Sequence, residues 1–201
     1  MPEVVFAIPG DLASATGGYA YDRQLLTHLP RSGIEISHLP LAGSFPHPTE
    51  DDIARTVEAV TAASANSIVL FDGLAFSALP ARAIRRIARP IVAIVHHPLS
   101  YEAGLSEPRR RELHVSEREA LALAAGVVVS SATTASVLAA DFGVPAERIT
   151  VAVPGTARVA RARSSGIVPS ILSVGAVSPR KGYDILVDAL ARIAEIGRAH
   201  V

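Results

Sequence analysis

Three pairs of adjacent residues in the 201-residue chain have side-chain types that could do chemistry. They are Gly17-Gly18, His96-His97 and Arg180-Lys181. Glycine leaves backbone N–H groups open to an anion, and imidazole can hydrogen-bond to a substrate or exchange a proton with it. A guanidinium beside an ammonium group suits a diphosphate. Whether any pair binds a ligand depends on the elements that position it.

The glycine pair comes just before a predicted helix, in a loop over residues 9–18. Backbone N–H groups and the helix dipole make such a helix start an anion site. The chain contains neither G-x-G-x-x-G nor G-x-x-x-x-G-K-[ST], which excludes the dinucleotide and Walker patterns. The alternative is that Gly17 and Gly18 only shape a turn.

His96 directly follows the apolar run 91–95, so we expect its imidazole at the carboxyl end of a buried strand. A substrate hydroxyl or carbonyl could accept a hydrogen bond from it there. A purely structural hydrogen bond is the alternative. His96 and His97 should point to opposite sides of an extended segment, and the other histidines are scattered, so we expect no metal site.

Several other charged residues have simpler interpretations. Asp72 follows an apolar run and should cap the next helix. Glu117 and Glu119 should lie on a solvated helix face. Arg180 and Lys181 precede a predicted helix, and a pair of solvated surface cations is the alternative to a diphosphate site.

Six apolar runs predict strands in the first 155 residues, at 4–8, 34–36, 67–71, 91–95, 127–129 and 149–153. Near-continuous apolar runs indicate strands buried on both faces, as in a parallel sheet. Predicted helices alternate with the runs, at 19–29, from 49 onward, 76–88, 108–125 and 134–142. The expected fold class is therefore α/β, a doubly wound, Rossmann-like parallel sheet. Such sheets bind ligands beyond the carboxyl ends of their strands.

Composition excludes several classes of protein. Basic and acidic residues both number 19, and this zero net charge argues against nucleic acid as a partner. The absence of cysteine excludes disulfides, cysteine-bound zinc and thiol catalysis. Residues 120–140 carry no charge, but Gly126 and five hydroxyl side chains indicate helix, strand and helix rather than a membrane span. No signal peptide is recognised, so we expect a cytoplasmic protein.

The character of the sequence changes after residue 155. Residues 156–169 contain glycine, proline and arginine and predict a linker. A strand at 170–174 and a helix at 183–194 predict the start of a second domain, cut short. Residues 195–201 match the translation of a common sequencing adapter, so we expect a non-native tail; an ordinary helix end is the alternative.

A series of segments in the chain resembles the family 4 glycosyltransferases, which have the glycosyltransferase-B fold. The series consists of Thr16-Gly17-Gly18, Val95-His96-His97-Pro98, Glu119 through Ser131, 142–145, 149–156, 171–175 and Pro179-Arg180-Lys181-Gly182-Tyr183-Asp184. The resemblance extends over residues 1–194. It implies an N-terminal acceptor-side domain over 1–155 and the start of a C-terminal nucleotide-sugar-binding domain over 170–194.

The resemblance implies a retaining, hexosyltransferase-type enzyme of glycan biosynthesis. Its donor would be a nucleotide sugar, and its acceptor a glycan, a lipid-linked molecule or a small molecule. No cofactor and no metal are implied. The family's paired glutamates belong to a region that the chain lacks, so we expect the 201 residues to be inactive by themselves.

The resemblance also assigns roles to the three pairs. Gly17 and Gly18 would contact the donor phosphate and sugar, and His96 would be the catalytic histidine near the transferred sugar. Arg180 and Lys181 would meet the diphosphate leaving group, where negative charge develops. Many relatives carry an arginine where this chain has Ala176, and Arg180 would supply that charge.

A different class of function stays open on the residues alone. It is a non-catalytic α/β module that binds a sugar or a partner through the same cleft. Peripheral membrane contact would suit a lipid acceptor, although no strongly basic amphipathic helix supports it.

Overall fold

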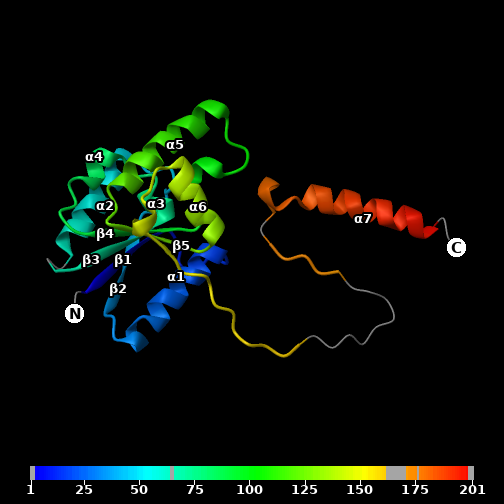
Figure 1. The fold of residues 1–201 in the computed structure, drawn as a ribbon, viewed down its shortest axis with the longest axis horizontal. Helices are drawn as coiled ribbons and strands as arrows, with labels where there is room; N and C mark the ends of the chain where they lie inside the picture. Colours follow the sequence, from blue (N-terminus) through cyan, green and yellow to red (C-terminus); the bar gives the residue numbers. More distant parts are fainter. Residues whose placement is uncertain (1–2, 64–65, 162–170, 176, 199–201) are drawn as a thin grey trace. The chain divides into compact units, whose positions relative to one another are not determined.

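The structure is a computed structural model that describes residues 3–63, 66–161, 171–175 and 177–198 (Figure 1). The chain divides into two compact units, Met1–Gly155 and Thr156–Val201. Each unit is described by itself.

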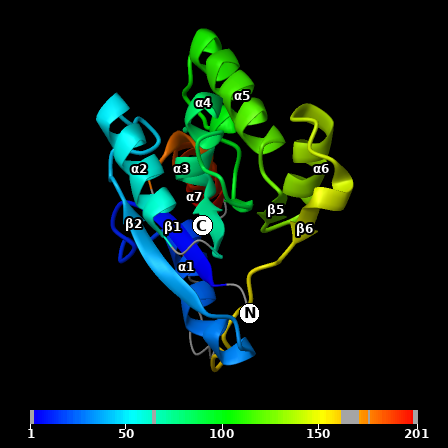
Figure 2. The ribbon, with the colours of Figure 1, turned by 90° about the vertical axis from the view of Figure 1, so that its left-hand side faces the viewer.

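The first unit contains a six-stranded sheet in which all paired strands run parallel. The strands are β1 (Val4–Pro9), β2 (Ile36–Leu41), β3 (Ile68–Asp72), β4 (Ile91–Val95), β5 (Gly126–Val129) and β6 (Ile149–Val151). Their order is β2-β1-β3-β4-β5-β6, with β2 and β6 at opposite edges (Figure 2). The chain therefore changes direction across the sheet between β1 and β3, and the predicted parallel sheet is confirmed.

Helices and short turns connect the strands. The helices are α1 (Gly17–His28), α2 (Glu50–Ala62), α3 (Gly73–Phe76), α4 (Ala81–Ile84), α5 (Glu107–Ala122) and α6 (Ala132–Asp141). Turns of 3-10 helix cover Pro30–Ser32, Leu99–Tyr101 and Ala146–Arg148.

Two apolar cores lie on opposite faces of the sheet. Alternate residues of a strand point to opposite faces, so Phe71 belongs to the core under α2–α6, whereas Leu70 belongs to the other. The second core includes Phe6 and Ile8, with Leu25 of α1 packed against it. The fully buried Phe6, Ile8 and Phe71 make both strand faces inaccessible to water, as the apolar runs predict.

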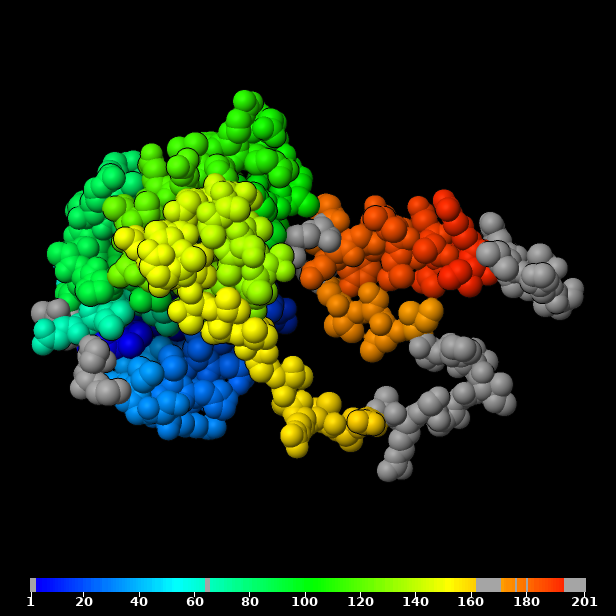
Figure 3. All heavy atoms as spheres, viewed as in Figure 1, coloured from blue at the N-terminus to red at the C-terminus, as the bar shows by residue number. Residues whose placement is uncertain are grey.

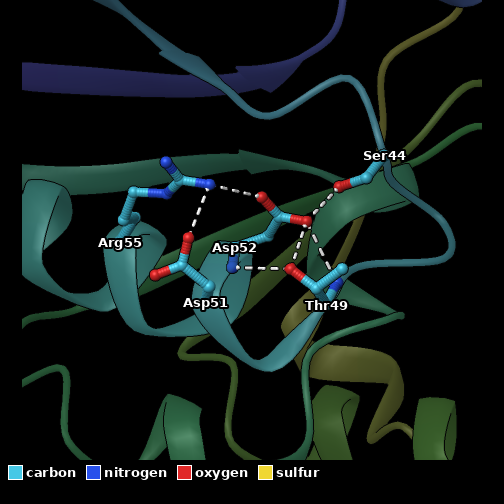
Figure 4. Close-up of polar contacts among 5 residues, drawn as sticks. All are labelled: Ser44, Thr49, Asp51, Asp52 and Arg55. Atoms are coloured by element: carbon cyan, nitrogen blue, oxygen red, sulfur yellow. Dashed lines mark hydrogen bonds and ion pairs between the residues drawn. The ribbon is translucent and has the colours of Figure 1, made fainter.

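A capping box starts α2 at the residue expected from the sequence (Figure 4). The Thr49 hydroxyl accepts a hydrogen bond from the Asp52 backbone N–H at 3.1 Å, and Asp52 Oδ2 accepts one from the Thr49 backbone N–H at 3.0 Å. Asp52 also accepts from Ser44 at 2.8 Å and from Arg55 at 3.1 Å. These hydrogen bonds, that of the Thr49 backbone first, hold the pKa of Asp52 well below its usual range.

Two sequence predictions are wrong in detail. The expected helix over 76–88 is replaced by the short helices α3 and α4, because Pro80 interrupts the segment and α3 already begins after Asp72. The second strand lies at Ile36–Leu41 rather than 34–36. The uncharged stretch 120–140 forms the end of α5, β5 and most of α6, as predicted.

The described part of the second unit contains a 3-10 turn at Pro179–Lys181 and α7 (Tyr183–Arg198). The predicted strand is absent from the described residues 171–174, and residue 170 lies outside them. A strand needs a neighbour to satisfy its backbone groups, and the described residues of this unit provide none. Ile171, Leu172 and Val174 are accordingly exposed.

A helix that spans a membrane must be both long and apolar. Within the described part of the chain, every helix is too short or too polar to cross a bilayer.

A buried carboxylate fixes the turn that follows His96 and His97. Glu117 of α5 is fully buried, and its Oε1 accepts a hydrogen bond from the Leu99 backbone N–H at 3.0 Å. Its Oε2 accepts from the Ser100 backbone N–H at 3.3 Å and from the Ser100 hydroxyl at 3.1 Å. The expectation that Glu117 is solvated is therefore wrong, because Glu117 lies on the helix face that packs inward. Glu119 is exposed, as expected.

We predict that Glu117→Ala destabilises the first unit by about 3 kcal/mol, because three buried donors lose their acceptor. Glu119→Ala, the matched control on the exposed face of the same helix, should change stability by less than about 0.5 kcal/mol. Urea unfolding of both variants measures the difference. Equal effects of the two substitutions would show that the buried hydrogen bonds contribute nothing.

Candidate functional site

The loop between β1 and α1 is held against the start of the helix. The Thr16 hydroxyl caps α1 by accepting a hydrogen bond from the Tyr19 backbone N–H at 3.2 Å. The Tyr19 hydroxyl donates to the Pro9 carbonyl at 2.7 Å, and Arg23 donates to the Leu12 carbonyl. Three hydrogen bonds thus hold the N-terminus of α1 at the carboxyl end of β1.

Gly18 lies close beside the His96 imidazole. A Cβ built on Gly18 would lie 3.2 Å from Cδ2 of the His96 imidazole, which is closer than an ordinary contact. Gly17 is the first residue of α1, and a Cβ on it would meet nothing within 4 Å. Glycine at position 18 therefore lets the helix start approach the imidazole, while position 17 faces open space.

Two buried carboxylates face the same imidazole. His96 Nε2 lies 3.4 Å from Asp22 Oδ1 and 3.9 Å from Asp72 Oδ2. The Asp22 side chain is 0% exposed and that of Asp72 is 5% exposed, whereas the His96 side chain is 24% exposed. Asp72 also caps α3, as predicted, because its Oδ1 accepts a hydrogen bond from the Leu74 backbone N–H at 2.8 Å.

The two acids and the imidazole alter one another's protonation. Burial and then the negative charge of Asp22 raise the pKa of Asp72 to about 7. Burial disfavours the imidazolium, but the hydrogen bond and charge of Asp22 and the charge of Asp72 outweigh it and raise the pKa of His96. Asp72 and His96 therefore bind protons more tightly than they would in water.

Asp22, Asp72 and His96 are also the residue types that ligate metals. Among the described residues they form the one group whose ligand atoms all lie within 4.8 Å of one another. A cation that prefers oxygen and imidazole ligands would suit these three side chains. The expectation that no metal is bound stays a prediction.

The sequence interpretation missed Asp22, although a signal for it exists. Asp22 lies three residues after Tyr19 and four before Leu26, which both pack against the core under α1. An acid in the apolar stripe of a helix is buried by the fold, so it calls for a partner. Glu117 could have been found in the same way.

Tyr21 joins this cluster to the end of the sheet. Its ring packs edge-on against His96, with centroids 5.2 Å apart and planes at 78°. Its hydroxyl donates to the Ala152 carbonyl at 2.9 Å, just after β6. Figure 3 shows the yellow atoms of this segment close to the blue atoms of α1.

Hollows lie at several places on the surface of the first unit. A groove of about 400 Å³, here called the α1 groove, is lined by Gly17, Tyr21 and Gln24 on one side and by Val153 on the other. A second groove of about 380 Å³ lies among α2, α4 and α5. Its arginines are paired within the unit, for example Arg82 with Glu50 at 2.6 Å.

The predicted cation pair lies in the second unit. Lys181 is exposed at the end of the 3-10 turn before α7. The Tyr183 hydroxyl donates to the Gly175 carbonyl at 3.0 Å and closes the loop around it. The Arg180 side chain and Ala176 lie outside the described parts. Both roles assigned to the cations stay predictions.

We predict that the free energy of unfolding falls as the pH rises from about 5 to about 7.5. The folded pKa of Asp72, about 7, is above its ordinary value of 3.8, so in this range the folded chain gives up a proton that the unfolded chain has already lost. The raised pKa of His96 acts in the same direction. Asp72→Asn preserves a capping side chain and removes this titration.

The variant should therefore lose at least about 1 kcal/mol less than the wild type over the same pH range. Urea unfolding at several pH values gives both slopes. Identical slopes would rule out a raised pKa at Asp72.

Comparison with known proteins identifies the family of the first unit. A family model described as a glycosyl transferase 4-like domain matches residues 4–155, which is more than half of the chain and ends where the first unit ends. No curated protein sequence matches the chain. The chain therefore belongs to the glycosyl transferase 4-like family, and its general function is that of a glycosyltransferase.

Proposed function

We propose that the protein transfers a hexosyl group from a nucleotide sugar to a glycan, lipid-linked or small-molecule acceptor, with retention at the anomeric carbon. The observation that carries the proposal is the close approach of the glycine-bearing start of α1 to His96, at the carboxyl end of the parallel sheet.

The start of α1 supports an anionic donor. The backbone N–H groups of a helix N-terminus and its dipole favour a phosphate. Position 17 faces open space, so a ligand can approach the backbone there. The α1 groove begins at the same residue, and the acceptor is proposed to lie in it.

His96 is proposed as the catalytic residue near the transferred sugar. It is partly exposed, and its Nδ1 forms no hydrogen bond with any described residue. Lys181 is proposed to meet the diphosphate, since an exposed ammonium just before a helix can offset the charge of a departing phosphate.

The test is steady-state kinetics and calorimetry on the protein expressed from its complete reading frame. His96→Ala should lower kcat about 100-fold and leave nucleoside diphosphate affinity nearly unchanged. Lys181→Ala should weaken nucleoside diphosphate binding and slow transfer by about 30- to 1000-fold, as expected for a lost charged contact of about 2–4 kcal/mol.

Arg192→Ala removes an exposed cation of α7 and is the matched control. It should leave rate and affinity at wild-type values. If sugars bind but no variant or wild-type protein transfers them, the protein is a non-catalytic binding module. If Lys181→Ala behaves like Arg192→Ala, Lys181 has no role at the diphosphate.

A further inference from the structure

Burial of the Asp22 side chain carries a free-energy cost. Its side chain is fully buried, and Oδ2 has no hydrogen-bond partner within the described residues. A carboxylate in such surroundings costs several kcal/mol unless a charge or a donor offsets it. The neighbouring Arg23 does not do so, because its guanidinium donates to the carbonyls of Leu12 and Ser14.

His96 is the one positively charged partner that Asp22 has among the described residues. The imidazole presents Nε2 to Asp22 Oδ1 at 3.4 Å and to Asp72 Oδ2 at 3.9 Å. Since two carboxylates face this nitrogen, Nε2 must carry a proton for the contacts to be favourable. The Tyr21 ring packs edge-on against the imidazole and Gly18 lies close beside it, so both limit rotation of the ring.

We propose that Asp22 is the positioning residue of His96: it holds the Nε2 proton inward and leaves Nδ1 as the nitrogen that meets the substrate. The inference rests on the proposed function and deepens it. In the neutral ring Nδ1 accepts a hydrogen bond from a sugar hydroxyl, and in the protonated ring it donates one to a phosphate or sugar oxygen.

Nδ1 is available to form a hydrogen bond with the substrate. It has no hydrogen-bond partner among the described residues, and it is not one of their buried unpaired atoms. Fixing one tautomer in advance removes the need to reorganise the ring in the transition state. A carboxylate behind a catalytic imidazole does the same in other enzymes.

The charged groups around the ring favour this arrangement. The titratable groups around the imidazole are Asp22, Tyr21 and Tyr19 of α1, Asp72 at the end of β3, and His38 of β2. Partial burial lowers the pKa of His38. The raised pKa of His96 therefore makes its imidazole the group that holds positive charge here near neutral pH.

Nitrogen-15 NMR of histidine-labelled protein tests the proposal without any ligand. The signals of His96 are assigned from their absence in His96→Gln. In the wild type, the neutral imidazole should carry its proton on Nε2. A neutral ring protonated on Nδ1 would overturn the proposal.

Asp22→Asn is the informative variant, because an amide keeps the shape and removes the charge. The pKa of His96 should fall by about 1 to 3 pH units, and the preference for the Nε2 tautomer should weaken. Asp51→Asn, an exposed acid on α2, should leave both unchanged. An unchanged His96 pKa in Asp22→Asn would overturn the proposal.

Kinetics with the accepted nucleotide sugar then separate positioning from a merely structural role. Asp22→Asn should lower kcat about 100-fold with little change in donor KM, and it should add little to His96→Ala, since it acts through His96. A full additional loss in the His96→Ala background would contradict the proposal. Absence of transfer in the wild type, with the NMR result intact, would instead contradict the proposed function.

A metal site at the same residues is the remaining outcome. Addition of Mn²⁺ alone should leave the His96 signals sharp at protein-equivalent concentration. Stoichiometric broadening that Asp22→Asn abolishes would show that Asp22 ligates a cation, and it would overturn the positioning role.

Discussion

The carboxylates of Asp22 and Asp72 share one buried space with the His96 imidazole, and two such acids cannot both stay charged there without compensation. Either a proton or the imidazolium must offset them. Burial and then the nearby charge of Asp22 raise the pKa of Asp72, and the two carboxylates together outweigh burial and raise the pKa of His96. In the proposed positioning role, this constraint orients the ring and leaves Nδ1 for the substrate.

The fold supplies each member of this cluster from a different element. Asp22 comes from α1, Asp72 from the end of β3, and His96 from the residue after β4. Parallel strands bring their carboxyl ends to one edge of the sheet, and the switch point between β1 and β3 leaves room for a ligand at that edge. Glu117 then fixes the turn after His96 from the side of α5.

The sequence predicted the architecture because strand burial leaves a strong pattern. Runs such as 91–95 have no polar residue, and only a sheet covered on both faces hides them all. The sequence predictions were wrong where the hydrogen-bond partners of the backbone decide which secondary structure forms. An apolar run at 171–174 meets no neighbouring strand in the described residues, and Pro80 divides a helix that the apolar pattern alone would continue.

The site was predictable only in part for a similar reason. Gly18 and His96 are residue types that stand out in loops after strands, and they do lie together. Asp22 and Glu117 stand inside helices, where an acid is ordinarily a solvated residue. Their position in the apolar stripe was the available signal, but the partner that justifies burial lies 74 residues away for Asp22 and is visible only in three dimensions.

In the proposed function, sugar and phosphate bind where the start of α1 lies beside His96. Hydrogen–deuterium exchange of the protein expressed from its complete reading frame, with and without uridine or guanosine diphosphate sugars, locates the bound donor. We expect slower exchange in the peptides that cover residues 10–18 and 96–101 with the accepted donor. Slower exchange confined to the groove among α2, α4 and α5 would contradict it.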